Sequence, residues 1–116
     1  MSDITTTVDE LREEIRQFVD ARDWHQFHSP KNVSMALAIE AAELMEHFQW
    51  IDVPASRQLD QDQIAAVGEE LADVFCYTLA MANELGIDLT ETMRAKMVKN
   101  IAKYPADQCR GRFEAP

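Results

Sequence analysis

The sequence has 116 residues, of which 47% are hydrophobic and 28% charged, with only three glycines and four prolines. This composition is typical of one globular domain and excludes a disordered or fibrous chain. The formal net charge of −10 repels nucleic acid and anionic lipid, so we expect neither as a partner, whereas a free nucleotide is compatible with locally concentrated positive charge.

The sequence also predicts a protein of the reducing cytosol. No uninterrupted apolar run approaches the roughly 20 residues that a membrane-spanning helix needs. The N-terminal stretch MSDITTTVDELREE lacks the basic and then apolar pattern of an export signal. Two cysteines, Cys76 and Cys109, are too few for a disulfide framework. We therefore expect a cytoplasmic location and no membrane partner.

Periodicity and end signals predict four helices, and no segment alternates as a strand does. The first helix begins near Thr7, which can form a capping box with Glu10. Its apolar stripe, opposite Arg and Glu side chains, consists of Val8, Leu11, Ile15, Phe18 and Val19. Ser29 as N-cap and Pro30 in the first turn open a second helix, which should run to about Trp50.

The third helix is expected to start after Asp60 and to run to Leu85. Gly86 then suits the left-handed position that ends many helices. The connection before this helix, residues 51–59, reads as a loop. The middle of the helix, LADVFCYTLAMA, carries a single charge, Asp73. A segment this apolar predicts a helix that is buried around most of its circumference.

The fourth helix is expected after Asp88, which can cap it with Glu91 completing the capping box, and it ends before Pro105. Residues 106–116 read as a loose tail, so we expect one all-α domain over residues 1–105. The second and third helices are apolar on most faces, which indicates that they cross in a bundle or bury a face against another subunit. Because both are expected in so short a chain, we predict a homo-oligomer.

Two pairs of acidic residues interrupt the most apolar parts of the second and third helices. Glu40 and Glu43 are the only charged residues of MALAIEAAELM. Glu70 and Asp73 repeat the three-residue spacing within EELADV. Residues three apart lie on one side of a helix, so each pair forms one local group. If the helices pack antiparallel, as their short connection suggests, the four carboxylates converge, and their mutual repulsion favours a bound cation.

All-oxygen ligation suits Mg²⁺, Mn²⁺ or Ca²⁺ better than iron or zinc. The Glu-x-x-His pattern of di-iron bundles is absent, because Glu46 stands three residues after Glu43. His47 is expected to face solvent or to be a structural neighbour at the helix end. The competing interpretation is pairing of the carboxylates with Lys or Arg, and single E-x-x-E pairs are also common on helix surfaces.

Positive charge gathers in residues 94–103, RAKMVKNIAK, although the chain has 21 acidic and 11 basic residues. Lys96, Asn100 and Lys103 fall on one face of this helix, and Lys99 forms an overlapping pair with Lys103. Favourable placement of cations near a helix C-terminus is the simpler explanation. Beside a cluster of metal-binding carboxylates, the same helix would hold phosphate oxygens.

Aromatic side chains gather around both acidic pairs in the sequence. They are Trp24, Phe27 and His28 before the second helix, Trp50 at its end, and Tyr77 one turn beyond Asp73. For each of them alone, packing in the core is the ordinary role. Together they would line a pocket in which a planar base stacks and His28 reads its edge, and such stacking contributes about 1 to 3 kcal/mol.

Four motifs in this order resemble the MazG-like all-α nucleoside triphosphate pyrophosphohydrolases, most closely the dCTP pyrophosphatase branch. They are RDWHQFHSPKN, AIEAAELMEHFQW, EELADVFCY and KMVKNIAKYP. The resemblance implies a four-helix bundle, a homodimer or homotetramer, and dependence on Mg²⁺, with Mn²⁺ possible. It also implies cleavage of a (deoxy)nucleoside triphosphate to the monophosphate and pyrophosphate, which removes unwanted nucleotides from the pool.

The resemblance further implies roles for particular residues. The catalytic and metal-binding positions are matched by Glu40, Glu43, Glu70 and Asp73. The base-pocket positions are matched by Trp24, His28, Trp50 and Tyr77. The phosphate-side positions are matched by Lys96, Asn100 and Tyr104, and less closely by Lys99 and Lys103. Lys103 is a departure, because an arginine often precedes Tyr-Pro in the family, and a bidentate phosphate contact would be lost.

The resulting hypothesis is a Mg²⁺-dependent hydrolase of dCTP or a modified pyrimidine analogue. The carboxylates would hold the metal, and one of them, with Glu43 as the first candidate, would position or deprotonate the attacking water. Two alternatives stay open. One keeps the chemistry and changes the substrate to dUTP, a damaged nucleotide or phosphoribosyl-ATP. The other is a non-catalytic helical oligomer that binds nucleotide or protein.

Overall fold

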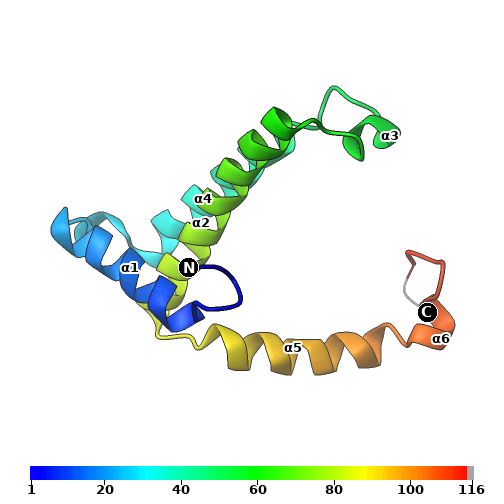
Figure 1. Ribbon diagram of the computed structural model, residues 1–116. Helices are drawn as coiled ribbons and strands as arrows, with labels where there is room; N and C mark the ends of the chain where they lie inside the picture. Colours follow the sequence, from blue (N-terminus) through cyan, green and yellow to red (C-terminus); the bar gives the residue numbers. More distant parts are fainter. Residues whose placement is uncertain (115–116) are drawn as a thin grey trace. The chain divides into compact units, whose positions relative to one another are not determined.

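The computed structural model describes residues 1–114 as a set of helices (Figure 1). Over this range no strand occurs, which confirms the all-α prediction. Each helix within residues 1–114 is too short or too polar to cross a membrane. By their internal contacts the residues form two compact units, Met1–Gly86 and Ile87–Pro116. The expected single domain over residues 1–105 therefore stays a prediction.

The first helix, α1 (Val8–Ala21), begins where the capping signal predicts. The Thr7 hydroxyl accepts from the Glu10 N–H at 3.1 Å, and the Glu10 carboxylate accepts from the Thr7 N–H at 3.0 Å. This reciprocal pair satisfies backbone donors that have no partner within the helix. A short 3₁₀ turn, η1 (His25–Phe27), then leads the chain into the second long helix.

That second helix, α2 (Pro30–Glu46), is capped by Ser29, as expected, but it ends four residues before Trp50. Residues 47–50 continue as turns, because the His47 N–H bonds to the Leu44 and Met45 carbonyls in a tightened last turn. The expected loop over residues 51–59 contains the short helix α3 (Val53–Ser56). The prediction was therefore wrong about the end of α2 and incomplete about this loop.

The longest helix, α4 (Gln61–Leu85), has both predicted ends. The Asp60 carboxylate accepts from the Gln63 N–H at 2.8 Å, and the Gln63 side chain accepts from the Asp60 N–H at 2.9 Å. At the other end Gly86 has φ of 64°, a left-handed conformation that carries no Cβ penalty in glycine. Local capping chemistry thus fixes the length of the helix that carries Glu70 and Asp73.

In the first unit α2 and α4 lie side by side, and α1 packs on the C-terminal half of α4 (Figure 1). The buried apolar side chains are Val19, Val33, Leu79, Ala80 and Ala82. Several large apolar side chains of α2 and α4 stay exposed, namely Met35, Ile39, Met45, Ile64, Leu71 and Phe75. Burial of these faces against another subunit remains a prediction.

The second unit is built on α5 (Leu89–Lys103), whose N-cap Asp88 accepts from the Glu91 N–H at 2.8 Å. The helix stops before Pro105, as expected. The segment that reads as a loose tail contains one further turn of helix, α6 (Ala106–Cys109), so that interpretation was wrong for these four residues. The last two residues of the expected tail, 115–116, lie outside the described residues.

Candidate functional site

The structure brings together three of the four predicted carboxylates. Glu40 and Glu43 project from α2 and Glu70 from α4, and one oxygen of each lies within 4.8 Å of the others. The α4 residue Glu70 meets the middle of α2, whereas Tyr77, two turns later, shares a hollow with Val33 near the start of α2. The two helices therefore run antiparallel, and this arrangement makes the acidic pairs converge.

The electrostatics of this carboxylate cluster, Glu40, Glu43 and Glu70, fit a cation. Oε2 of Glu40 and Oε2 of Glu70 are out of contact with solvent and have no hydrogen-bond partner in the described chain. Removal from water raises the pKa of Glu40 to about 7, and Glu43 adds to the shift through its hydrogen bond and its charge. Burial and Glu43 also raise the pKa of Glu70. Oxygen donors of this kind suit Mg²⁺ or Mn²⁺.

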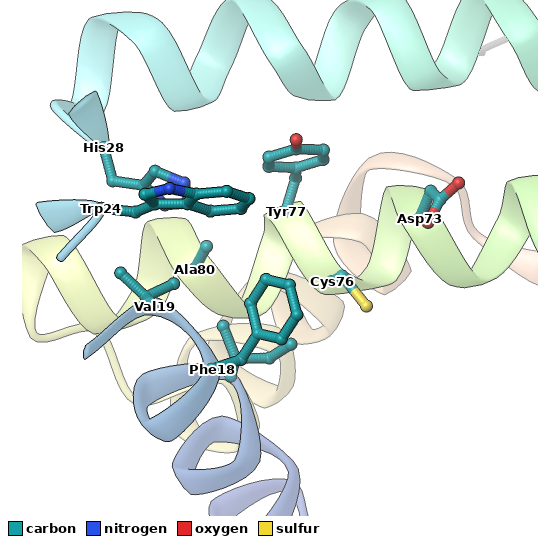
Figure 2. A pocket seen from close by; sticks show the side chains of 9 residues that line it. Phe18, Val19, Trp24, His28, Asp73, Cys76, Tyr77 and Ala80 are labelled. Atoms are coloured by element: carbon teal, nitrogen blue, oxygen red, sulfur yellow. The ribbon is translucent and has the colours of Figure 1, made fainter. Parts of the chain in front are cut away.

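Asp73 connects the carboxylate cluster to a neighbouring pocket. It lies one turn beyond Glu70 on α4, is exposed, and stands outside the close group of three. Its charge nevertheless contributes to the raised pKa values of Glu40 and Glu70. Its side chain also lines a pocket of about 370 Å³ between α1 and α4 (Figure 2). The acidic cluster and the pocket are therefore adjacent.

Aromatic rings form much of this pocket, as Figure 2 shows. The Trp24 ring lies edge-on to Phe18 at 5.6 Å and is stacked near His28 at 6.3 Å. The ring of His28 is 6.4 Å from that of Tyr77. The full lining is Ile15, Phe18, Val19, Trp24, His28, Asp73, Cys76, Tyr77 and Ala80. A mostly apolar hollow with few polar groups is the usual form of a small-molecule site.

A second hollow of about 300 Å³ lies toward α2 and shares Trp24, His28 and Tyr77 with the first. Nδ1 of His28 is buried and has no hydrogen-bond partner among the described atoms. A buried polar nitrogen without a partner lowers the stability of the fold, so binding of a ligand that forms a hydrogen bond with this nitrogen would be favoured. Burial, together with the charges of Glu40 and Asp73, raises the pKa of the Tyr77 hydroxyl.

Trp50 and the predicted phosphate-side residues are not among the residues that line these hollows. Trp50 is 88% exposed and lines neither hollow. It follows the C-terminal end of α2, whereas His28 precedes the start of this 17-residue helix, so the two are separated by about 25 Å of helix. The five phosphate-side residues belong to the second unit, and their role stays a prediction. They are Lys96, Lys99, Asn100, Lys103 and Tyr104.

The sequence reasoning missed the wall of the pocket that α1 supplies. Phe18 and Ile15 belong to the apolar stripe of an amphipathic helix, and Cys76 belongs to an apolar run of α4, and all three line the pocket. Their spacing shows that they face the interior but not which cavity they line. His47, expected at a helix end, is the C-cap of α2, and its Nε2 lies 3.9 Å from Oε1 of Glu70.

The chain is similar to known proteins over most of its length. The family model described as MazG-like matches residues 35–113. The chain is similar to dCTP pyrophosphatase 1 of Homo sapiens, 38% identical over 106 residues, and of Bos taurus, 36% identical over 107 residues. Each alignment covers 90% of this chain, but the chain spans only 62% and 63% of those relatives. A solved pyrophosphatase from Archaeoglobus fulgidus is 35% identical with a TM-score of 0.81, covering 90% of this chain and 98% of that one.

Proposed function

The chain belongs to the MazG-like family, and from that premise we propose that it is a nucleoside triphosphate pyrophosphohydrolase. The substrate is dCTP or a modified pyrimidine analogue, and the products are the monophosphate and pyrophosphate. The observation that carries the proposal is that Asp73 lines the aromatic pocket one turn from Glu70 of the carboxylate cluster. A base held by the rings would thus place its phosphates beside the acidic groups.

Glu40, Glu43 and Glu70, with Asp73, are the residues that would hold Mg²⁺, and Mn²⁺ suits the same donors. A divalent cation bound here would neutralise negative charge on the triphosphate oxygens, including the charge that develops during attack at the α-phosphorus. One oxygen of Glu43 lies within 4.8 Å of an oxygen of Glu40 and of an oxygen of Glu70. In this proposal Glu43 would orient the attacking water and accept its proton.

The aromatic pocket would bind the base. Trp24 and Tyr77 offer flat faces on which a pyrimidine can stack, and this kind of stacking contributes about 1 to 3 kcal/mol per base. The buried Nδ1 of His28 supplies one hydrogen-bonding position for the edge of the base. The lysines of α5 would neutralise phosphate oxygens, a role that rests on the family resemblance.

We also propose that the protein is a cytoplasmic homodimer or homotetramer. Exposed apolar side chains on α2 and α4 support the assembly, because a partner subunit would remove them from water. Free Cys76 and Cys109 and a nucleotide substrate support the location. Sedimentation velocity tests the assembly. Met35→Glu, on the exposed face of α2, should shift the protein toward a smaller species. A parent protein that sediments as a monomer would refute the proposed assembly.

The function is tested by pyrophosphate release from a panel of triphosphates, with and without Mg²⁺. The panel contains dCTP, 5-methyl-dCTP, dUTP, dTTP, ATP and phosphoribosyl-ATP. Glu43→Gln and Asp73→Asn should each lower Mg²⁺-dependent turnover about a hundredfold or more. The control is Glu46→Gln, an exposed carboxylate at the end of the same helix, which should change little. Unchanged turnover in Glu43→Gln would refute the mechanism, and failure across the panel would favour the non-catalytic oligomer.

A further inference from the structure

His25 joins two helix ends beside the aromatic pocket. It opens the 3₁₀ turn η1, and its Nε2 contacts the carboxylate of Asp20 on α1. Its Nδ1 lies 3.1 Å from Oε1 of Glu84 on α4. Both carboxylates stand close to the C-terminal ends of their helices, where the backbone carbonyls concentrate partial negative charge. Arg22 meets part of this charge at the Phe18 carbonyl of α1, and Arg12 meets part of it at the Ala82 carbonyl of α4. Neither helix has a basic residue in its last turn.

This surrounding favours a cation between the two helix ends. An imidazolium donates from both nitrogens and can satisfy both carboxylates, whereas a neutral imidazole donates from only one. Hydrogen bonding to Glu84, and then to Asp20, raises the pKa of His25 above its ordinary value. Of the other charged groups in the turn, Arg22 lies over the Phe18 ring at 3.8 Å, and Asp23 accepts from Gln26.

The turn that His25 holds also carries two walls of the pocket. Trp24 immediately precedes His25, and the His28 N–H donates to the carbonyls of both Trp24 and His25 at 3.1 Å. On α4, Glu84 lies two helical turns beyond Tyr77 and so shares its face. The contact between His25 and Glu84 therefore ties the turn to the helix that bears the opposite wall.

We propose that His25 is a positioning residue of the base pocket. Bridged to Asp20 and Glu84, its charged form fixes Trp24 and His28 opposite Tyr77, and loss of its proton releases one of the two contacts and loosens this wall. The effect on catalysis rests on the proposed function, but the effect on the wall does not.

The structural test is an NMR titration of the full chain from pH 5.5 to 9. The three histidines report their own protonation, and the indole N–H of Trp24, assigned with Trp50→Phe, reports the wall. The Trp24 resonance should move with the protonation of His25. In His25→Arg, which keeps the charge and both donors, it should stay at its low-pH position, and in His25→Gln near its high-pH position. The other neighbours of Trp24 are unchanged in all three proteins, so their contributions cancel in the comparison.

The kinetic test is the KM for dCTP measured between pH 6 and 8.5. The ratio of the parent's KM to that of His25→Arg should rise about threefold over this range, while the ratio of their kcat values stays constant. An effect of this modest size is expected for exposed ion pairs. Glu13→Gln, which removes an exposed pair with Arg16 on α1, should leave the profile unaltered. A Trp24 titration that is identical in the parent and His25→Arg overturns the inference. An inactive parent protein overturns only the proposed function, and the NMR result then decides the role of His25.

Discussion

Glu40 on α2 and Glu70 on α4 lie against one another, and each has one carboxylate oxygen withdrawn from solvent with no hydrogen-bond partner in the described chain. The pKa of Glu40 is raised from 4.5 to about 7, so the metal-free folded protein binds more protons than the unfolded chain between these values. The stability from protonated Glu40 is complete below about 4.5 and is lost as the pH rises through about 7.

We therefore expect the melting temperature of the metal-free protein to fall between pH 5 and pH 8. Glu40→Gln should flatten this part of the profile, because a neutral amide does not titrate. Glu46→Gln, which changes the same net charge at an exposed position, should leave the slope as it is. Equal slopes in the parent and Glu40→Gln would show that other groups cause the pH dependence.

Mg²⁺ should raise the melting temperature at pH 8. A ligand that binds only the folded state adds about 2.7 kcal/mol to the free energy of unfolding at a hundred times its Kd. Calorimetry with and without excess Mg²⁺ measures the gain, and Glu43→Gln or Glu70→Gln should remove most of it. A gain that persists in these variants would place the cation elsewhere, and no gain in the parent would support the non-catalytic alternative.

Tyr77→Leu should raise the KM for dCTP about fivefold or more, because it removes a stacking surface that contributes about 1 to 3 kcal/mol. Tyr77→Phe keeps the ring and is the matched control, with an expected KM close to that of the parent. Steady-state pyrophosphate release measures both. A large loss in Tyr77→Phe would instead assign the main role to the hydroxyl group.

Leu79→Ala should lower the free energy of unfolding by about 2 to 5 kcal/mol, because Leu79 is only 2% exposed and its truncation leaves a cavity. Leu85, near the end of the same helix, is 54% exposed, and Leu85→Ala should cost much less. Urea denaturation at a fixed protein concentration compares the two. Similar losses would mean that a partner subunit buries Leu85.

Capping chemistry made the helix starts predictable, because Thr7, Ser29, Asp60 and Asp88 act on backbone groups within three residues. The end of α2 was not predictable, since no glycine or proline occurs between Glu46 and Pro54. The short helix α3 did have a signal, because Asp52 caps it and Pro54 stands in its first turn. Such four-residue helices lack the periodicity that identifies longer ones.

The carboxylate cluster was predictable for a similar reason. The spacing of Glu40 and Glu43 fixes their common side on one helix, and antiparallel packing brings Glu70 to them. The contribution of Phe18 to the pocket depends on how α1 packs on α4, which is a tertiary relation that spacing does not encode. For the same reason, the exposure of Trp50 did not follow from its place in the sequence.

The antiparallel pairing of α2 and α4 also sets an order of assembly. Glu43 and Glu70 are 27 positions apart, whereas Phe18 and Tyr77 are 59 apart, and a doubled loop costs about 0.6 kcal/mol more to close. The helical hairpin should therefore form before α1 closes the pocket. Its formation brings three carboxylates together, so their repulsion opposes an early folding step. Mg²⁺ should then speed refolding in stopped-flow experiments. The refolding rate would therefore depend on the concentration of the cation.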